Sequence, residues 1–318
     1  MNHQPSQKPA INPLKFCDPY VTAKGEARAQ VALMALKTLW INTGTLCNIT
    51  CANCYIESSP RNDALSYISA AEVAAFLNEA AASHLPLRDV GFTGGEPFMN
   101  PEFLVMLEDT LRRGLRTLAL TNAMKPMMNQ ATGLLALQEK YGDGLTLRVS
   151  LDHPDAAIHD AERGAGSFER TLEGLRFLAE HGFRLHIAGR AAFGAGDEAK
   201  LRADFAALFA AHGIPVNTAD PVAMMLFPEM DATADVPEIS TACWGILDKS
   251  PDSLMCASAR MVVKRKGAAR PAVLACTLLA YDPQFELGTT LAEASRPVAL
   301  NHPHCAKFCV LGGATCSR

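Results

Sequence analysis

The chain has 318 residues, more than one small domain needs and enough to bury a large core. Hydrophobic residues make up 49% and charged residues 19%, as in soluble globular proteins. The formal net charge of −4 argues against a nucleic-acid backbone as partner, although a local basic patch stays open. The start of the chain is polar and proline-rich, unlike a secretory signal, and no apolar stretch reaches the roughly 18 residues of a spanning helix. We therefore expect a cytoplasmic protein with no membrane partner.

In chain order, short apolar or half-apolar runs bounded by turn residues alternate with helical patterns. Strand–helix–strand crossovers normally build a parallel sheet, so the fold class is α/β. Periodicity alone does not decide between a barrel and an open doubly wound sheet. The predicted strands are 38–43, 89–93, 115–121, 145–151, 183–188 and a sixth around 215–218.

Three of the helices between these strands have start or stop signals. Ser69 and Glu72 have the spacing of a capping box. Ser167 is expected to cap the helix "FERTLEGLRFLAEHG", which ends at Gly182, and "DEAKLRADFAALFAAHG" ends at Gly213. These signals support the alternating pattern.

The ten cysteines are distributed unevenly. Three lie in "CNITCANCY" at positions 47–55, six lie in the last quarter, and Cys17 stands apart as an incidental thiol. Because cytosolic thiol pools keep ordinary cysteine pairs reduced, structural disulfides are not expected. Metal or redox chemistry is the leading explanation for both groups.

The first group, Cys47, Cys51 and Cys54, follows the first predicted strand, and the next strand ends in "TGGEP" at 93–97. Loops at the carboxyl ends of neighbouring parallel strands lie side by side. A structural zinc site needs four protein ligands, commonly two separated pairs, and no second pair is near in sequence. A four-iron cluster can be held by three thiolates with one iron left free. The odd ligand count favours this open cluster.

These motifs resemble the radical SAM superfamily. The resemblance rests on Cys-x3-Cys-x2-Cys after a first strand, Tyr55 directly after it, and Gly94-Gly95-Glu96-Pro97 after the second strand, within residues 38–218. It implies a partial (β/α)6 TIM-type barrel and a [4Fe-4S] cluster that chelates S-adenosylmethionine through its unique iron. It also implies reductive cleavage to a 5′-deoxyadenosyl radical that abstracts hydrogen from a substrate, and a reductant such as flavodoxin or ferredoxin.

The resemblance extends to the cofactor contacts. Gly94 and Gly95 would let the backbone approach a ligand, and a carbonyl there or Glu96 would accept from an ammonium group. Asn122, with Thr121, matches the "TN" that lies beside the adenosine in this family. A turn without ligand is the alternative for each.

A further segment, "RVSLDHPDAAIHDAERGAGSF", is similar to the version of the family that modifies peptides. By that similarity Ser150 contacts the ribose and Arg163 pairs with the carboxylate of S-adenosylmethionine, where a guanidinium fork fits two oxygens. His153 stands where that version has glycine. Arg190, at the end of the fifth strand, is a further candidate to face the cofactor.

The C-terminal third departs from the barrel pattern. "ARMVVKRKGAARPAVLA" reads as two strands joined by a turn, and such a hairpin would bring Cys256 and Cys276 together. Cys305 and Cys309 would share one face of a helix, with Cys316 beyond a glycine reversal. The region resembles the twitch or SPASM extension, which implies one auxiliary [4Fe-4S] cluster with these five cysteines as candidate ligands. A zinc site and unligated thiols stay open, and Cys243 is a ligand or a hydrogen-atom donor.

The sequence therefore predicts three parts: a leader at 1–37, a radical SAM barrel at 38–220, and a cysteine-rich extension at 221–318. The expected function is radical chemistry on a peptide, such as oxidation, crosslinking or epimerisation. A small-molecule or cofactor-biosynthesis reaction is the first alternative, and a non-catalytic zinc-binding module is the second. No side chain is identified as the substrate acid or base.

Overall fold

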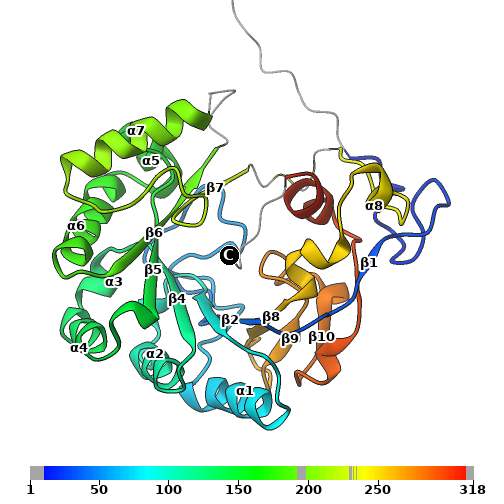
Figure 1. Cartoon of the computed structure of the whole chain (residues 1–318), viewed down its shortest axis with the longest axis horizontal. Coiled ribbons are helices and arrows are strands. Elements are labelled where there is room, and N and C mark those ends of the chain that lie inside the picture. Colours follow the sequence, from blue (N-terminus) through cyan, green and yellow to red (C-terminus); the bar gives the residue numbers. More distant parts are fainter. Residues whose placement is uncertain (1–10, 192–197, 229–230, 232, 234, 313–318) are drawn as a thin grey trace, which may run out of the picture.

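The computed structural model describes residues 11–191, 198–228, 231, 233 and 235–312. Six parallel strands, β2 to β7, stand side by side in chain order, and helices α1 to α7 cover their outer side (Figure 1). This arrangement confirms the partial α/β barrel. The strands are β1 (Gln30–Val31), β2 (Thr38–Asn42), β3 (Asp89–Thr93), β4 (Arg116–Thr121), β5 (Leu145–Ser150), β6 (Arg184–Arg190), β7 (Met224–Phe227), β8 (Ala259–Val263), β9 (Ala272–Leu274), β10 (Glu286–Gly288) and β11 (Val298–Ala299). The α-helices are α1 (Ala70–Ala82), α2 (Phe103–Arg112), α3 (Lys125–Met128), α4 (Ala131–Tyr141), α5 (Ala156–Arg163), α6 (Ser167–Glu180), α7 (Glu198–Ala211) and α8 (Cys243–Ile246).

The C-terminal extension continues the barrel sheet. Within the described residues, nine strands form one sheet in the order β10-β9-β8-β2-β3-β4-β5-β6-β7. Strand β8 pairs in parallel with β2, and β9 and β10 follow antiparallel. The predicted hairpin is confirmed as β8 and β9, with Met261 opposite Leu274. The three-part division of the chain stays a prediction, and the sheet runs through its boundary at residue 220.

The predicted sixth strand is wrong in position. Residues 215–218 form a loop and a turn, and the strand lies later, at β7, where Met224 pairs with Ile187 of β6. The side chains of Asn217 and Asp220 accept the backbone N–H groups of Ala219 and Val222, at 3.1 and 2.8 Å. Such local side-chain bonds stabilise turns and compete with a strand ladder.

Two helix starts test the capping predictions. The capping box is confirmed, because Ser69 Oγ accepts from the Glu72 N–H at 3.2 Å and Glu72 accepts from the Ser69 N–H at 3.0 Å. The predicted cap at Ser167 is wrong: Gly166 precedes the helix in the left-handed region, and Ser167 is its first residue. The side chain of Asp160 in α5 caps the start of α6 instead, accepting hydrogen bonds from the N–H groups of Gly166 and Phe168. The stop at Gly182 is confirmed by its φ of +69°.

Two apolar clusters form the interior. The larger packs the barrel sheet against the outer helices and continues into the extension, and the smaller packs β2 against the extension. Among the described helices, none is both long and apolar enough to span a membrane. Members of the smaller cluster include Trp40, Ile56, Leu65, Met261, Leu274 and Phe308.

Candidate active site

The three clustered cysteines lie at the carboxyl end of the barrel strands. The loop after β2 carries Cys47, Cys51 and Cys54, and all three line one cavity of about 120 Å³, which we call the thiol cavity. Gly94 and Gly95 of the turn after β3 line the same cavity. The two predicted loops are therefore neighbours, as expected from parallel strands.

The glycines serve the packing of these two loops against each other. The Gly95 N–H donates to Gly44 O at 2.7 Å, and the Glu96 N–H donates to Leu46 O at 3.1 Å. A Cβ atom on Gly95 would lie 2.1 Å from Leu46 O, and Gly94 has φ +151°. The two glycines were expected to let the backbone come close to a ligand. In the structure they let the backbone come close to the cysteine loop, since only glycine fits there.

Glu96 is buried beneath the turn, at 1% exposure. Its carboxylate accepts from Thr121 Oγ1 at 2.9 Å, from the Asn122 N–H at 2.8 Å and from the Phe98 N–H at 3.2 Å. Burial raises its pKa to about 7, against these hydrogen bonds, which lower it. Its side chain joins the ends of β3 and β4, and a contact of Glu96 with a cofactor stays a prediction.

Asn122 does line the thiol cavity, as does Ser150 at the end of β5. Asn122 also donates through Nδ2 to Asn48 Oδ1 at 2.8 Å, so it holds the residue that follows Cys47. Both predicted contact residues are therefore brought to the cysteines.

Arg163 lies in this cavity with its guanidinium already paired. It forms a two-pronged ion pair with Asp152, with Nε–Oδ2 at 2.7 Å and Nη2–Oδ1 at 3.0 Å. Burial opposes the charge on Asp152, but Arg163 and then Arg190 hold its pKa below the usual value. A partnership of Arg163 with an incoming carboxylate stays a prediction and would have to share or displace Asp152.

A second buried carboxylate, that of Glu162, anchors the cysteine loop through hydrogen bonds. Glu162 accepts from the Asn53 N–H at 3.0 Å and from Asn53 Nδ2 at 2.8 Å, between Cys51 and Cys54. Arg190 donates to Asn53 O at 3.0 Å and pairs with Glu162 at 3.0 Å. Arg190 does line the thiol cavity, and sequence reasoning missed Glu162 and Asn53, whose contacts hold the cysteine loop.

A second cavity, the central cavity, of about 140 Å³ adjoins the thiol cavity inside the barrel. Apolar side chains from the barrel and the extension, among them Leu120, Phe227 and Phe308, line much of it. Six residues line both cavities: Tyr55, Thr93, Leu120, Ser150, Arg163 and Arg190.

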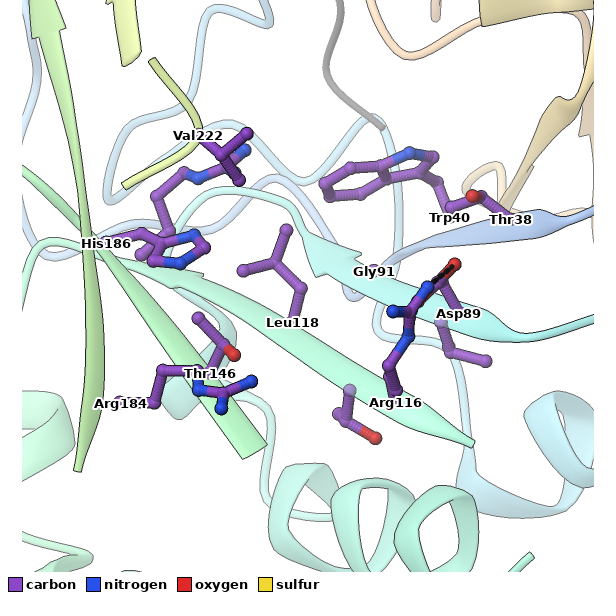
Figure 2. Close-up of a pocket in the computed structure, with 13 residues that line it drawn as sticks. Thr38, Trp40, Asp89, Gly91, Arg116, Leu118, Thr146, Arg184, His186 and Val222 are labelled. Carbon is purple, nitrogen blue, oxygen red and sulfur yellow. Dashed lines mark hydrogen bonds and ion pairs between the residues drawn. The ribbon is translucent and has the colours of Figure 1, made fainter. Parts of the chain in front are cut away.

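The opposite, amino-terminal ends of the strands surround a separate cavity of about 340 Å³ (Figure 2). Trp40 and Arg148 line both this lower cavity and the central one, so they form the floor between them. Figure 2 shows Trp40 beside Gly91, where a Cβ atom would lie 2.5 Å from the indole ring. The lower cavity is therefore on the far side of the floor from the cysteines.

Four of the C-terminal cysteines gather at a fourth cavity, the extension cavity. Cys256, Cys276, Cys305 and Cys309 all line it, together with His304. The last two lie on η7 (Cys305–Leu311), a π-helix, so the predicted helix is present but wider than an α-helix. Cys316 lies outside the described residues. Cys243 lines none of these cavities, and its Sγ lies 3.7 Å from Ser240 Oγ.

A buried cation accompanies these thiols. Arg260, in strand β8 of the hairpin, is 1% exposed. It donates to four backbone carbonyls, including Cys256 O at 2.6 Å and Ala294 O at 2.8 Å. Within the described part of the chain, no three His, Cys, Asp or Glu side chains come close enough to hold one metal ion.

Comparison with known proteins identifies the barrel. The family model of the Radical SAM superfamily matches residues 41–196. The chain is 29% identical over 143 residues to the subtilosin biosynthesis protein AlbA of Bacillus subtilis, covering 45% of this chain and 30% of AlbA. It is 28% identical over 142 residues to the AdoMet-dependent heme synthase of Oleidesulfovibrio alaskensis, covering 44% of this chain and 34% of that enzyme. The match therefore spans about a third of the length of these curated relatives.

The fold has a wider likeness. The crystal structure of Streptococcus suis SuiB bound to S-adenosylmethionine superposes with a TM-score of 0.57 at 14% identity, covering 88% of this chain and 68% of SuiB. Taken together with the motifs, these matches show that residues 41–196 form a radical SAM domain.

The residues present fit the cofactors of that family, a [4Fe-4S] cluster and S-adenosylmethionine. Three thiols and no fourth cysteine line the thiol cavity as described, the donor set of an open cluster. Burial raises the pKa of Cys47 to about 12 and raises the pKa of Cys51. Since cysteine binds iron as the thiolate, metal binding there would displace protons.

Proposed function

We propose that this protein is a radical SAM enzyme that modifies a peptide. One observation carries the proposal: the thiol cavity opens onto the central cavity through shared lining residues, and Leu278 links the central cavity to the extension cavity. A cofactor site, a space for substrate and a second thiol site thus lie next to one another in this order in space. This order suits a radical that is generated at one end and a product that is oxidised at the other.

Cys47, Cys51 and Cys54 would hold the [4Fe-4S] cluster, and Ser150, Asn122 and the Gly94–Gly95 turn would contact S-adenosylmethionine. When bound, these cofactors supply a 5′-deoxyadenosyl radical that abstracts hydrogen from the substrate. The chain itself orients and encloses the reactants. Glu162 fixes the cysteine loop through Asn53. Trp40 and Arg148 close the floor, which limits access of water from below.

Arg163 and Asp152 would set the charge of the site. Their ion pair lines the boundary between the two cavities and is nearly neutral as a unit. An incoming carboxylate that engages Arg163 would meet Asp152 as well, and Arg190 beside them is already paired with Glu162, so these four side chains offer no net positive charge. This arrangement supports a zwitterionic amino-acid cofactor better than a simple dianion.

The peptide substrate is supported by relatives. AlbA is described as a bacteriocin biosynthesis protein, and SuiB has been solved bound to a precursor peptide. The mostly apolar central cavity has room for one side chain of such a peptide. The same small size, about 140 Å³, also favours a second candidate, a small-molecule reaction like that of the heme synthase relative.

The extension would hold one auxiliary [4Fe-4S] cluster, with Cys256, Cys276, Cys305 and Cys309 as ligands and Cys316 as a further candidate. The support is their common cavity and the buried charge of Arg260, which would offset the negative charge of a thiolate-bound cluster. A cytoplasmic location and an external reductant belong to the same proposal.

The test is anaerobic purification with iron counting and a product assay. Two [4Fe-4S] clusters require about eight irons per chain, and one requires about four. The variant C47A/C51A/C54A is expected to lose about four irons and all reductant-dependent 5′-deoxyadenosine. C256A/C276A is expected to lose the other four irons but to retain 5′-deoxyadenosine formation.

C17A is the matched control, since Cys17 is exposed and lines none of the cavities. A colourless protein with zinc would favour the binding-module alternative. Persistence of 5′-deoxyadenosine in the triple variant would mean that the wrong thiols have been assigned.

A further inference from the structure

A surface groove of about 480 Å³ lies beside the cysteine loop and shares no lining residue with the central cavity. Its walls come from the turn after β3, from the start of α3 and from the first turn of α6. Asn48, the neighbour of Cys47, lines it. We call this surface the loop groove.

Asn48 separates the loop groove from the thiol cavity. Cys47 and Asn122 both line the thiol cavity, and Asn48 is bonded to the first by the chain and to the second by a 2.8 Å hydrogen bond. No residue of the substrate space lines the groove. The loop groove is therefore a surface from which the cluster position can be approached without entering the substrate cavity.

The groove is positively charged in an otherwise acidic chain. Lys125 and Arg170 line it, both are exposed, and no Asp or Glu is among its described lining residues. The Arg170 guanidinium is held in place by Gly166 O at 2.8 Å and Ala165 O at 2.7 Å. The net charge of the whole protein is −4, so these two cations form a locally positive surface on a negatively charged protein.

Apolar side chains occupy the space between the cations. Phe98 is buried, and Met99 and Pro126 are half-buried in the groove wall. Gln130 Nε2 donates to Phe98 O at 2.6 Å and fixes this wall against α4. An apolar strip between two cations is complementary to an apolar redox group surrounded by carboxylates.

We propose that the loop groove is the docking site of the electron donor, an acidic flavoprotein of the flavodoxin kind with an exposed flavin edge. The flavin edge would lie on the apolar strip, and carboxylates around it would pair with Lys125 and Arg170. Electron transfer slows steeply with distance, so a donor must sit on a face next to the cluster loop. One electron passes from the reduced flavin to the site held by Cys47, Cys51 and Cys54, and the flavin is oxidised by one electron. This inference rests on the proposed function.

The test compares K125E/R170E with K24E/R270E, which changes the net charge equally. Lys24 and Arg270 are exposed and line none of the cavities described above. Figure 1 draws the segment before β1 and the β8–β9 hairpin on the other side of the molecule from α3. Cluster reduction is followed by electron paramagnetic resonance with photoreduced flavodoxin or with dithionite, and binding of oxidised flavodoxin by calorimetry at two salt concentrations.

K125E/R170E is expected to slow flavodoxin-dependent reduction about tenfold, to weaken flavodoxin binding by a similar factor and to remove its salt dependence. Reduction by dithionite should stay within about twofold of wild type, because a small reductant needs no docking. K24E/R270E should match wild type in every assay.

Equal losses in the two double variants, or unchanged flavodoxin binding in K125E/R170E, would overturn the docking site. If dithionite yields no 5′-deoxyadenosine from the wild-type protein, the proposed function fails instead, and calorimetry still reports whether flavodoxin binds at the groove.

Discussion

Some residues near the cysteines make more contacts within the protein than their motifs suggest. Glu96 is named in the family motif as a cofactor contact, yet its carboxylate bonds to three donors of the protein itself. Sequence reasoning identified the position from the motif. The partners of Glu96 come from a different strand, so no local pattern could reveal them.

Glu96 predicts a pH dependence of stability. Its pKa is about 7 in the folded chain against an ordinary value of 4.5, so between these values the native state holds a proton that the unfolded state has lost. Stability from this group is therefore greatest below pH 4.5 and falls as pH rises to 7. Wild type should lose roughly 2 to 3 kcal/mol more than E96Q between pH 5 and pH 8. Urea unfolding of the metal-free proteins at both values measures this, and parallel pH profiles would contradict it.

Other residues were missed for a similar reason. Asp152 follows β5 in "SLDH", but its pairing with Arg163 depends on the turn of α5 back toward the strand end. Arg260 lies in a basic segment that reads as solvated, and the packing of β8 between β2 and β9 buries it. The pattern of charged residues along a hairpin does not show which face of the hairpin is buried.

At the scale of elements, the contact between the turn after β3 and the loop after β2 sets the shape of the site. Gly95 has no room for a methyl group, because Leu46 O lies 2.1 Å from the Cβ position. Gly245 in α8 has no atom within 4 Å of its Cβ position and offers a matched control. Substitution by alanine should therefore disturb the structure at Gly95 and leave it unchanged at Gly245.

G95A is expected to displace the cysteine loop and to reduce iron retained at the first site to less than about half, with little change in circular dichroism. G245A should retain wild-type iron. Iron per chain after anaerobic reconstitution of the C256A/C276A background reports the first site alone. Full iron retention in G95A would show that the cysteine loop adjusts without cost.

Strands and helices were predictable to different degrees. Five barrel strands and the β8–β9 hairpin follow from apolar runs and turn residues, and the capping box located the start of α1. The sixth strand was misplaced because side-chain-to-backbone bonds at Asn217 and Asp220 stabilise turns where the sequence looked extended. The π-helix at Cys305–Leu311 has no local signature that distinguishes it from an α-helix.

At the scale of the whole molecule, the extension completes the barrel sheet. Strand β8 pairs in parallel with the edge of β2, and Met261, Leu274 and Phe308 cover Trp40 from the extension side. Sequence patterns predicted the hairpin but not this pairing, because register across more than 200 residues depends on tertiary packing. The barrel and the extension therefore share one sheet, and both apolar clusters include residues from each.

A chain cut after residue 228 should fail to stay monomeric. Removal of β8 exposes the backbone edge of β2 and the apolar face around Trp40, and such edges pair with other chains. Light scattering of the purified fragment should show association, whereas the full chain gives one species. A monomeric fragment with a cooperative unfolding transition would contradict this.

The pairing of β8 with β2 also constrains how new enzymes can be assembled from this one. A recombinant that borrows its cysteine-rich tail from a relative must bring a strand that matches the pleat and register of Thr38–Ile41, or replace β2 along with it. Any single crossover between β2 and β8 separates the two paired strands, so crossover points in a shuffled library are better placed before β2 than at the junction after β7. The barrel, which sets the substrate range, and the C-terminal extension would then be inherited together.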